Sequence, residues 1–389
     1  MKITLQNEDA LKSDILQRFL RYVKVCTTSD PRGTTTPTTQ CQWDLAKMLV
    51  DEIKCLGITD VLLTDHCYVI ARIAANTKRN VMPIGFLAHL DTSPDVNGEN
   101  VNPVYERESG IIRTDGKTLL GADDKAGIAE IMGAAAYIMA HNEIEHGTIE
   151  IIFTPDEETG AGLPCVPIEK ITAKACYTLD GGPIGEFETE CFNAYSAVVH
   201  FEGHEIHPGH ARGVLVNAAL MAANYAVLLP RSESPESTDG YYGYWALMEI
   251  EGNHEKAKLS MLVRDFDSKQ MKRRLEALES FARTVEAQFP GGKVTLETKF
   301  SYSNMKDEID KSPAVIEKLK TAAYNCGIDC IFKPIRGGTD GSRLTALGIP
   351  TPNIFTGGRN FHSRNEWVAL DDMLAAAKLV VELVRLYCS

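Results

Sequence analysis

The stretch TIEIIFTPDEETGAG, from Thr148 to Gly162, decides the fold, because a buried strand runs directly into a turn rich in carboxylates. Residues 149–153 form a nearly continuous apolar run, which is typical of a strand that is buried on both faces. Proline cannot donate to a β-ladder, so Pro155 ends this strand. Three crowded carboxylates follow, and they require solvent, a shared proton or a cation. The turn therefore indicates either a metal-assisted hydrolytic centre or a solvated acidic loop at Asp156, Glu157 and Glu158.

Length, charge and cysteine content narrow the class of protein. A chain of 389 residues, 44% of them apolar, is long for one core and predicts two domains. The net charge of −13 and the lack of basic clusters argue against a nucleic-acid partner. No apolar run is long enough to cross a bilayer and the first twelve residues are too polar for a signal peptide, so we expect a cytoplasmic protein without a membrane partner. The ten cysteines form no CxxC pair, which predicts free thiols and argues against cysteine metal ligands.

A second apolar strand is predicted at 84–90, and it carries His89 and Asp91 at its carboxyl end. Residues two apart in a strand share a face, so both side chains can enter one pocket. The histidine could then bind a metal through one ring nitrogen while the aspartate accepts a hydrogen bond from the other. An ordinary buried histidine is the alternative.

Two further acidic segments recur in the same setting. Asp123 and Asp124 open a long apolar helix at 127–140, where they are either caps or a carboxylate that bridges two cations. Asp180 ends a buried strand at 174–179. We count four segments in which a strand ends in an acidic or histidine-bearing turn. Ligands of α/β proteins gather beyond the carboxyl ends of the strands, so these segments predict one shared site.

The pattern of elements changes near residue 184. The order strand, helix, strand, strand, helix, strand is that of a ferredoxin-like domain, which we expect to be inserted into the first domain as a lid. The predicted domains are a catalytic domain at 1–184, the lid at 185–302 and the rest of the catalytic domain at 303–389. The predicted lid elements are strands at 195–203, 244–251, 257–266 and 293–302 and helices at 214–229 and 269–289.

The remaining α/β elements are predicted from apolar periodicity. The segment RGGTDGSR, at 336–343, is interpreted as a loop, and His362 lies in a glycine-rich loop where a metal ligand and an ordinary loop histidine are both open. Of the three histidines in GHEIHPGHARG, we favour His207 as the functional one. The expected helices are 10–25, 41–56, 314–326 and 370–386, and the expected strands are 61–64, 68–73, 331–334 and 353–355.

Seven motifs together resemble those of the M20 metallopeptidases, and within them the aminopeptidases that act on tripeptides. They occur in the expected order along nearly the whole chain: HLDT, GADDKAG, PDEETG, LDGG, HPGHARG, RGGTDGS and NFHSRNEW. The resemblance implies a zinc-exopeptidase-like catalytic domain, with a central mixed sheet flanked by helices, and an inserted ferredoxin-like lid.

The same resemblance implies a set of roles. Two zinc ions would be bridged by Asp123, one of them held by His89 and Asp180 and the other by Glu158 and His362. Cobalt or manganese could take the place of zinc, because nitrogen and oxygen ligands accept all three. A cis peptide would join Asp123 to Asp124. Of the other residues, Asp91 would orient His89, Glu157 would be the general base, and His207 would donate to the oxyanion.

The sequence constrains substrate recognition, and the choice among related functions, less than it constrains the metal ligands. The guanidinium of Arg336 matches a terminal carboxylate bidentately and is the predicted anchor, with a salt bridge to Asp340 as the alternative. The expected partner is a short peptide, and a homodimer is left open. A related carboxypeptidase, dipeptidase or deacylase is the nearer alternative function, and a peptide-binding protein without catalysis is the other.

Overall fold

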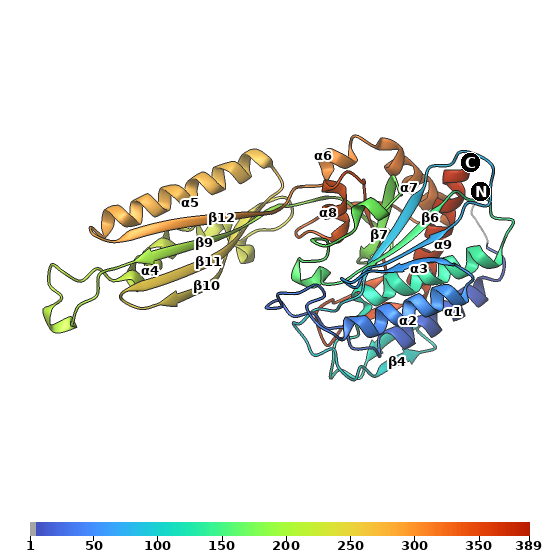
Figure 1. Cartoon of the computed structure of the whole chain (residues 1–389), viewed down its shortest axis with the longest axis horizontal. Coiled ribbons are helices and arrows are strands. Elements are labelled where there is room, and N and C mark those ends of the chain that lie inside the picture. Colours follow the sequence, from blue (N-terminus) through green and yellow to red (C-terminus); the bar gives the residue numbers. More distant parts are fainter. Residues whose placement is uncertain (1–4) are drawn as a thin grey trace. The chain divides into compact units, whose positions relative to one another are not determined.

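The computed structural model describes residues 5–389, so the first four residues of the predicted domain 1–184 lie outside the described part. Contacts divide the chain into two compact units (Figure 1). Unit 1 comprises the residues up to Thr189 together with Met305–Lys333 and Thr339–Ser389, and unit 2 comprises Glu190–Asn304 and Pro334–Gly338. Within the described residues, no helix is both long and apolar enough to span a bilayer.

The division differs from the predicted boundaries at three places, the smallest of which is residues 303–304, which belong to unit 2 and not to the second part of the catalytic domain. Residues 185–189 belong to unit 1 because β8 pairs with β14 of that unit. Pro334–Gly338 belongs to unit 2, where Arg336 donates hydrogen bonds to the carbonyl oxygens of Gly240 and Tyr242.

An eight-stranded mixed sheet forms the centre of unit 1, in the order β1-β2-β6-β3-β7-β14-β8-β13. Strands β6, β3, β7 and β14 run parallel to their neighbours in this central part, and β1, β2 and β8 pair antiparallel. The bounds are β1 Asp60–Leu63, β2 Val69–Ile73, β3 Ile84–His89, β6 Ile149–Thr154, β7 Ala175–Gly181, β8 Glu186–Cys191, β13 Ile331–Ile335 and β14 Asn353–Phe355.

The central strands are buried on both faces, as their apolar sequence predicts. All six residues of β3 and of β6 are buried. Ile151 and Phe153 pack into the larger core on one face, and Ile152 packs into a second cluster on the other. Helix α3 lies on β3 and packs against α1 and α9. The helices of unit 1 are α1 Glu8–Tyr22, α2 Gln42–Cys55, α3 Ala122–Ala140, α6 Lys306–Ile309, α7 Pro313–Cys326, α8 Asp340–Ala346 and α9 Leu370–Cys388.

Unit 1 also contains elements that the sequence pattern does not predict. A small antiparallel sheet has the order β15-β16-β5-β4, and its strands are too short to show a period of two. The predicted loop at 336–343 is wrong in its second half, because α8 begins at Asp340, where Thr339 and Ser342 form a capping box. The small sheet consists of β4 Pro103–Glu106, β5 Ile111–Thr114, β15 Gly358–Arg359 and β16 Trp367–Ala369.

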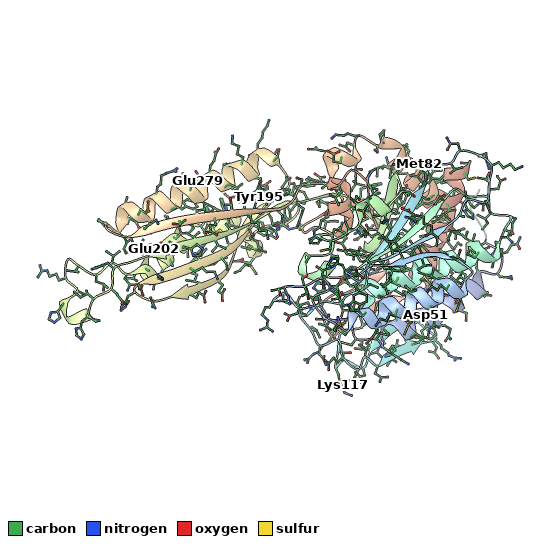
Figure 2. All side chains as sticks on the ribbon, in the orientation of Figure 1. Asp51, Met82, Lys117, Tyr195, Glu202 and Glu279 are labelled. Carbon is green, nitrogen blue, oxygen red and sulfur yellow. The ribbon has the colours of Figure 1, made fainter. Side chains whose placement is uncertain are left out.

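Unit 2 is an antiparallel sheet in the order β10-β11-β9-β12 with two helices, which is the predicted ferredoxin-like arrangement. Figure 2 marks Tyr195 and Glu202 along β9 and Glu279 on α5. The elements are β9 Asn193–Glu202, α4 Ala218–Leu228, β10 Tyr244–Gly252, β11 Lys256–Asp265, α5 Ser268–Gln288 and β12 Lys293–Tyr302. Short 3-10 segments are η1 Glu157–Thr159 and η2 Ile168–Lys170 in unit 1, and η3 Pro208–His210, η4 Arg231–Glu233 and η5 Pro235–Ser237 in unit 2.

Candidate metal centre

Three neighbouring strands bring polar residues to one edge of the main sheet. β3 runs parallel to both β6 and β7, so the carboxyl ends of all three meet there. His89 is the last residue of β3, η1 follows β6, and Asp180 lies at the end of β7. The count of four strand ends is one too many, because Asp123 lies at the opening of α3, as predicted, and β5 ends well before it, at Thr114.

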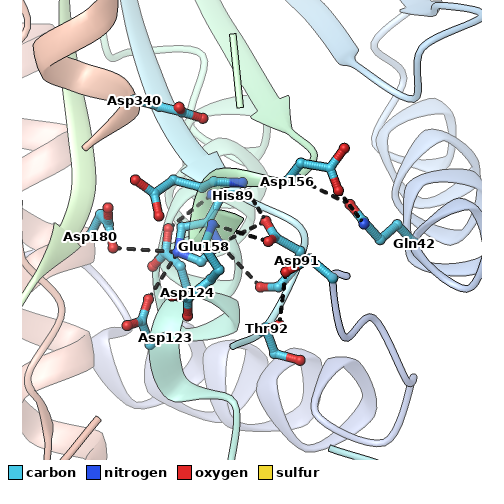
Figure 3. Close-up of polar contacts among 12 residues, drawn as sticks. Gln42, His89, Asp91, Thr92, Asp123, Asp124, Asp156, Glu158, Asp180 and Asp340 are labelled. Atoms are coloured by element: carbon cyan, nitrogen blue, oxygen red, sulfur yellow. Dashed lines mark hydrogen bonds and ion pairs between the residues drawn. The ribbon is translucent and has the colours of Figure 1, made fainter. Parts of the chain in front are cut away.

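All five predicted ligands lie in two groups that share Asp123. His89 Nε2 lies 2.9 Å from Asp123 Oδ1 and 3.5 Å from Asp180 Oδ1. His362 Nε2 lies 3.3 Å from Asp123 Oδ2 and 2.9 Å from Glu158 Oε2. Within each group, one donor atom from each residue lies within 4.8 Å of the others. Figure 3 shows Asp123 and Asp180 around His89.

Asp124 supports this arrangement through hydrogen bonds to the main chain. The peptide between Asp123 and Asp124 is cis, as the family resemblance implies. The fully buried carboxylate of Asp124 accepts hydrogen bonds from the backbone N–H of His89, at 3.0 Å, and from that of Gly127, at 3.3 Å. It thereby joins the end of β3 to the first turn of α3.

Asp91 makes two kinds of contact. Its Oδ1 lies 3.3 Å from His89 Nδ1, the ring nitrogen that faces away from Asp123. Its two oxygens also accept the backbone N–H groups of Glu157, at 2.9 Å, and Glu158, at 3.1 Å. One carboxylate therefore positions the imidazole of β3 and the acidic turn after β6.

Glu157 lies beside the two groups. Its carboxylate is nearly buried, at 12% exposure, and its Oε1 lies 3.7 Å from Nη1 of Arg343 on α8. Burial and the charge of Asp180 raise the pKa of Glu157 well above its usual value, so this group binds a proton readily. Arg343 in turn lies 3.1 Å from Oδ1 of the buried Asp340, which makes Arg343 the ion-pair partner of Asp340 in place of Arg336.

The pKa values of the clustered groups are shifted in the directions expected for several carboxylates held close together. Burial raises the pKa of Glu158 to about 7 and that of Asp180 to about 6. Hydrogen bonds to Asp123 and Glu158 raise the pKa of His362 to about 11. Burial disfavours the charged form of Asp123, yet the imidazoles of His362 and His89 lower its pKa. The pKa shifts of the histidines and of the carboxylates thus reflect the concentration of negative charge at this site.

The donor set fits divalent cations. Each group offers one imidazole nitrogen and carboxylate oxygens, which suit zinc, cobalt and manganese. Glu158 Oε1 is buried and, among the described residues, has no hydrogen-bond partner. A buried charged oxygen without a partner is costly, and a cation would satisfy it.

Asp156, the first of the three carboxylates after β6, has a different place from its neighbours. It accepts hydrogen bonds from the backbone N–H and the hydroxyl of Thr38 and from the side-chain amide of Gln42. It therefore fixes the segment before α2 next to the acidic turn. The local pattern did not separate this role from those of Glu157 and Glu158, because three adjacent carboxylates give no signal for which of them faces a partner. Only the family resemblance gave Glu157 and Glu158 roles that Asp156 does not have.

Glu366 was also missed as a functional residue. It belongs to the motif NFHSRNEW, but nothing in the local pattern distinguishes it from a surface carboxylate. The structure buries its side chain against the backbone that leads into Asp123.

Two predicted site residues lie in unit 2. His207 precedes η3 and its Nδ1 accepts the backbone N–H of Gly209 at 3.1 Å. Arg336 donates from Nη1 and Nη2 to the backbone oxygens of Thr238, Gly240 and Tyr242. It also lies over the rings of two aromatic residues, Phe192 and Tyr244.

With this fold and site in place, the sequence profile of peptidase family M20/M25/M40 matches residues 85–386. The chain belongs to this peptidase family.

Two individual members of the family are similar to this chain over nearly its whole length. The chain is 43% identical over 406 residues to peptidase T of Geobacillus thermodenitrificans, covering 97% of this chain and 99% of that protein. It is 43% identical over 398 residues to peptidase T of Clostridium perfringens, covering 95% of this chain and 98% of that protein.

Solved structures agree with this assignment. The aminopeptidase PepT from Bacillus cereus superposes with a TM-score of 0.81 at 25% identity and covers 97% of this chain and 99% of that one. A dinuclear metal binding peptidase of the M20 family from Bacillus subtilis has a TM-score of 0.71 at 14% identity, covers 97% of this chain and 98% of that one, and shows the shared fold.

Proposed function

We propose that this protein is a metal-dependent aminopeptidase that releases the N-terminal residue of short peptides, tripeptides foremost. The observation that carries the proposal is the sharing of Asp123 between two imidazole-containing groups, with the buried carboxylate of Glu157 next to them. The peptidase T relatives and the aminopeptidase PepT structure support the class of substrate.

The proposed centre would hold two zinc ions, one with His89 and Asp180 and the other with Glu158 and His362, and Asp123 would be shared by both groups. A pair of divalent ions in such a site polarises the scissile carbonyl and lowers the pKa of a shared water towards neutrality.

Glu157 is the proposed general base. Its carboxylate takes a proton from the attacking water and returns it to the leaving amine, so it must exchange a proton within each cycle. Arg343 lies close enough to limit where Glu157 Oε1 can move.

Two residues of unit 2 complete the proposal. Because His207 Nδ1 accepts a hydrogen bond from Gly209, the neutral ring carries its proton on Nε2, which can donate to an oxyanion. Arg336 is the proposed anchor for the terminal carboxylate of the peptide, because a guanidinium matches a carboxylate bidentately. Bidentate binding would require exchange of present contacts, since Nη1 and Nη2 already donate to Gly240, Tyr242 and Thr238. Its backbone contacts at residues 238–242 favour a structural role as well.

The function is tested with zinc-loaded protein and four substrates: trialanine, N-acetyl-trialanine, trialanine amide and dialanine. An aminopeptidase requires the free amine, so we expect release of the first residue from trialanine and no cleavage of the N-acetylated peptide. Release of the last residue first would identify a carboxypeptidase, and removal of the acetyl group a deacylase. Binding of trialanine with no turnover at any zinc concentration would indicate a peptide-binding protein.

We also propose a cytoplasmic location. Exposed thiols such as Cys55 and Cys330 are free, as is typical of proteins in a reducing compartment. A homodimer is left open, and sedimentation of the purified protein would distinguish it from a monomer.

A further inference from the structure

Glu366 is a buried carboxylate whose hydrogen bonds all lead to one turn. Its side chain is 2% exposed. Oε2 accepts the backbone N–H groups of Leu120 and Gly121, both at 2.8 Å. Oε1 accepts the backbone N–H of Asp123 at 3.1 Å. The same carboxylate therefore fixes both the approach to Asp123 and Asp123 itself.

The position of Glu366 in the chain gives these contacts a further consequence. His362 lies four residues earlier in the same loop, and its Nε2 faces Asp123 Oδ2. Directly after Glu366, strand β16 begins at Trp367, which pairs with Arg113 of β5. The Glu366 side chain thus joins the loop that carries His362 to the turn that carries Asp123. The backbone of Glu366 is itself held in place, because the next residue begins strand β16 of the small sheet.

Similar supports hold the other ligand-bearing segments. Asp91 accepts the backbone N–H groups of Glu157 and Glu158, and Asp124 accepts that of His89. In each contact a backbone N–H donates to a carboxylate oxygen, and such a hydrogen bond is stronger than a neutral one when the carboxylate is ionised. Glu366 is the member of this set that connects Asp123 to the loop that carries His362.

We propose that Glu366 is a positioning residue of the metal centre, which holds the backbone of Asp123 in register with His362. This inference rests on the proposed two-metal function. Outer contacts of this kind typically change metal affinity by about 10- to 100-fold when they are removed. Glu366 itself is not placed on an ion or on substrate.

The test compares Glu366→Gln with a matched control, Glu150→Gln. Glu150 is also fully buried and accepts backbone N–H groups, those of Thr172 and Ala173, but it lies at the start of β6, away from the carboxyl edge of the sheet. A glutamine at 366 has nearly the same volume and keeps one acceptor oxygen, which can serve the N–H groups of Leu120 and Gly121. Its amide N–H₂ would face the N–H of Asp123, so that hydrogen bond is lost. Glu366→Asp, which is shorter by one methylene, is measured in parallel.

Zn²⁺ affinity of the metal-free proteins is measured by competition with a chromophoric chelator, together with melting temperature and the Zn²⁺ dependence of trialanine hydrolysis. We expect both Glu366 variants to bind one Zn²⁺ about 10- to 100-fold more weakly, with turnover of Glu366→Gln recovering towards the wild-type value at saturating Zn²⁺. Glu150→Gln should lower the melting temperature and leave Zn²⁺ affinity unchanged.

Unchanged Zn²⁺ affinity in Glu366→Gln, with a loss of melting temperature like that of Glu150→Gln, would overturn the inference and leave a purely structural residue. Failure of the wild-type protein to bind two Zn²⁺ ions is a separate outcome, which would remove the proposed metal centre and this inference with it.

Discussion

Asp91 and His89 meet side by side beyond the end of β3, with 3.3 Å between Asp91 Oδ1 and His89 Nδ1. Both side chains are buried, at 0% and 2% exposure. Asp91 fixes one ring nitrogen and thereby leaves Nε2 to face Asp123 and Asp180. The same carboxylate holds the turn that contains Glu157 and Glu158.

Replacing Asp91 by alanine should therefore weaken the metal centre twice, once through His89 and once through the acidic turn. We expect a loss of Zn²⁺ affinity of about 10- to 100-fold and a parallel loss of kcat/KM with trialanine. Direct Zn²⁺ titration of the metal-free variant measures the first effect. Asp95→Ala is the comparison, since Asp95 reaches His362 Nδ1, at 3.2 Å, from a largely exposed position and should cost less. Equal effects of the two variants would contradict the role assigned to Asp91.

Replacing Glu157 by glutamine should separate catalysis from metal binding. The variant keeps the shape of the side chain but cannot exchange a proton, so we expect kcat to fall by about 10²- to 10⁴-fold with the full complement of metal. Metal analysis by mass spectrometry and steady-state kinetics on the same sample are required. A fully active Glu157→Gln protein with both ions bound would rule out the general-base role.

Removal of metal should destabilise unit 1, because the carboxylates of the centre lose the cations that offset their repulsion. Ligand binding stabilises the folded state by about 2.7 kcal/mol when free ligand is at 100 times its Kd. The melting temperature should therefore fall when a chelator is added and recover when excess Zn²⁺ is returned. The Glu158→Gln variant, which removes one ligand, should show a smaller drop. An unchanged melting temperature on chelation would count against a resident metal.

Glu130 on α3 offers a test of buried charge away from the centre. It is fully buried, and both of its carboxylate oxygens are without a hydrogen-bond partner in the described chain. Burial, with the nearby Asp372, raises its pKa well above the ordinary value of 4.5. The folded state therefore retains a proton that the unfolded chain loses near pH 4.5. As the pH rises above that value, this difference progressively lowers the free energy of unfolding.

Glu130→Gln mimics the protonated acid and should remove this pH dependence. We expect little difference from wild type near pH 4, and a free energy of unfolding higher than that of wild type by about 1 kcal/mol or more at pH 8. Urea unfolding at a series of pH values measures both. A variant that is less stable than wild type at pH 8 would show that Glu130 has a stabilising partner when charged.

Arg336→Lys tests the proposed carboxylate anchor. Lysine keeps the positive charge but cannot form two parallel hydrogen bonds, so KM for trialanine should rise by roughly tenfold with kcat little changed. The effect should vanish with trialanine amide, which has no terminal carboxylate. The same rise in KM for both peptides would leave Arg336 as a residue that only holds residues 238–242 in place.

Much of the fold follows from local pattern. Apolar runs at 84–90 and 149–153 contain only His89 and Glu150 as polar residues, too few for a solvent face, and both runs are buried strands of the central sheet. The ferredoxin-like order of unit 2 follows from the alternation of its strands and the period of its helices. Helix α8 and the small sheet were missed, because short elements carry too few residues to show a period.

The sequence by itself determined which residues can bind a metal and that three of them follow buried strands, because side-chain chemistry and strand pattern are local properties. Only the tertiary structure decided that Asp123 turns one carboxylate oxygen to His89 and the other to His362, a residue more than two hundred positions away. It also decided that Asp91 and Glu366 act on main-chain N–H groups. A backbone hydrogen bond between distant segments leaves no mark in the sequence, since every residue except proline offers the same N–H.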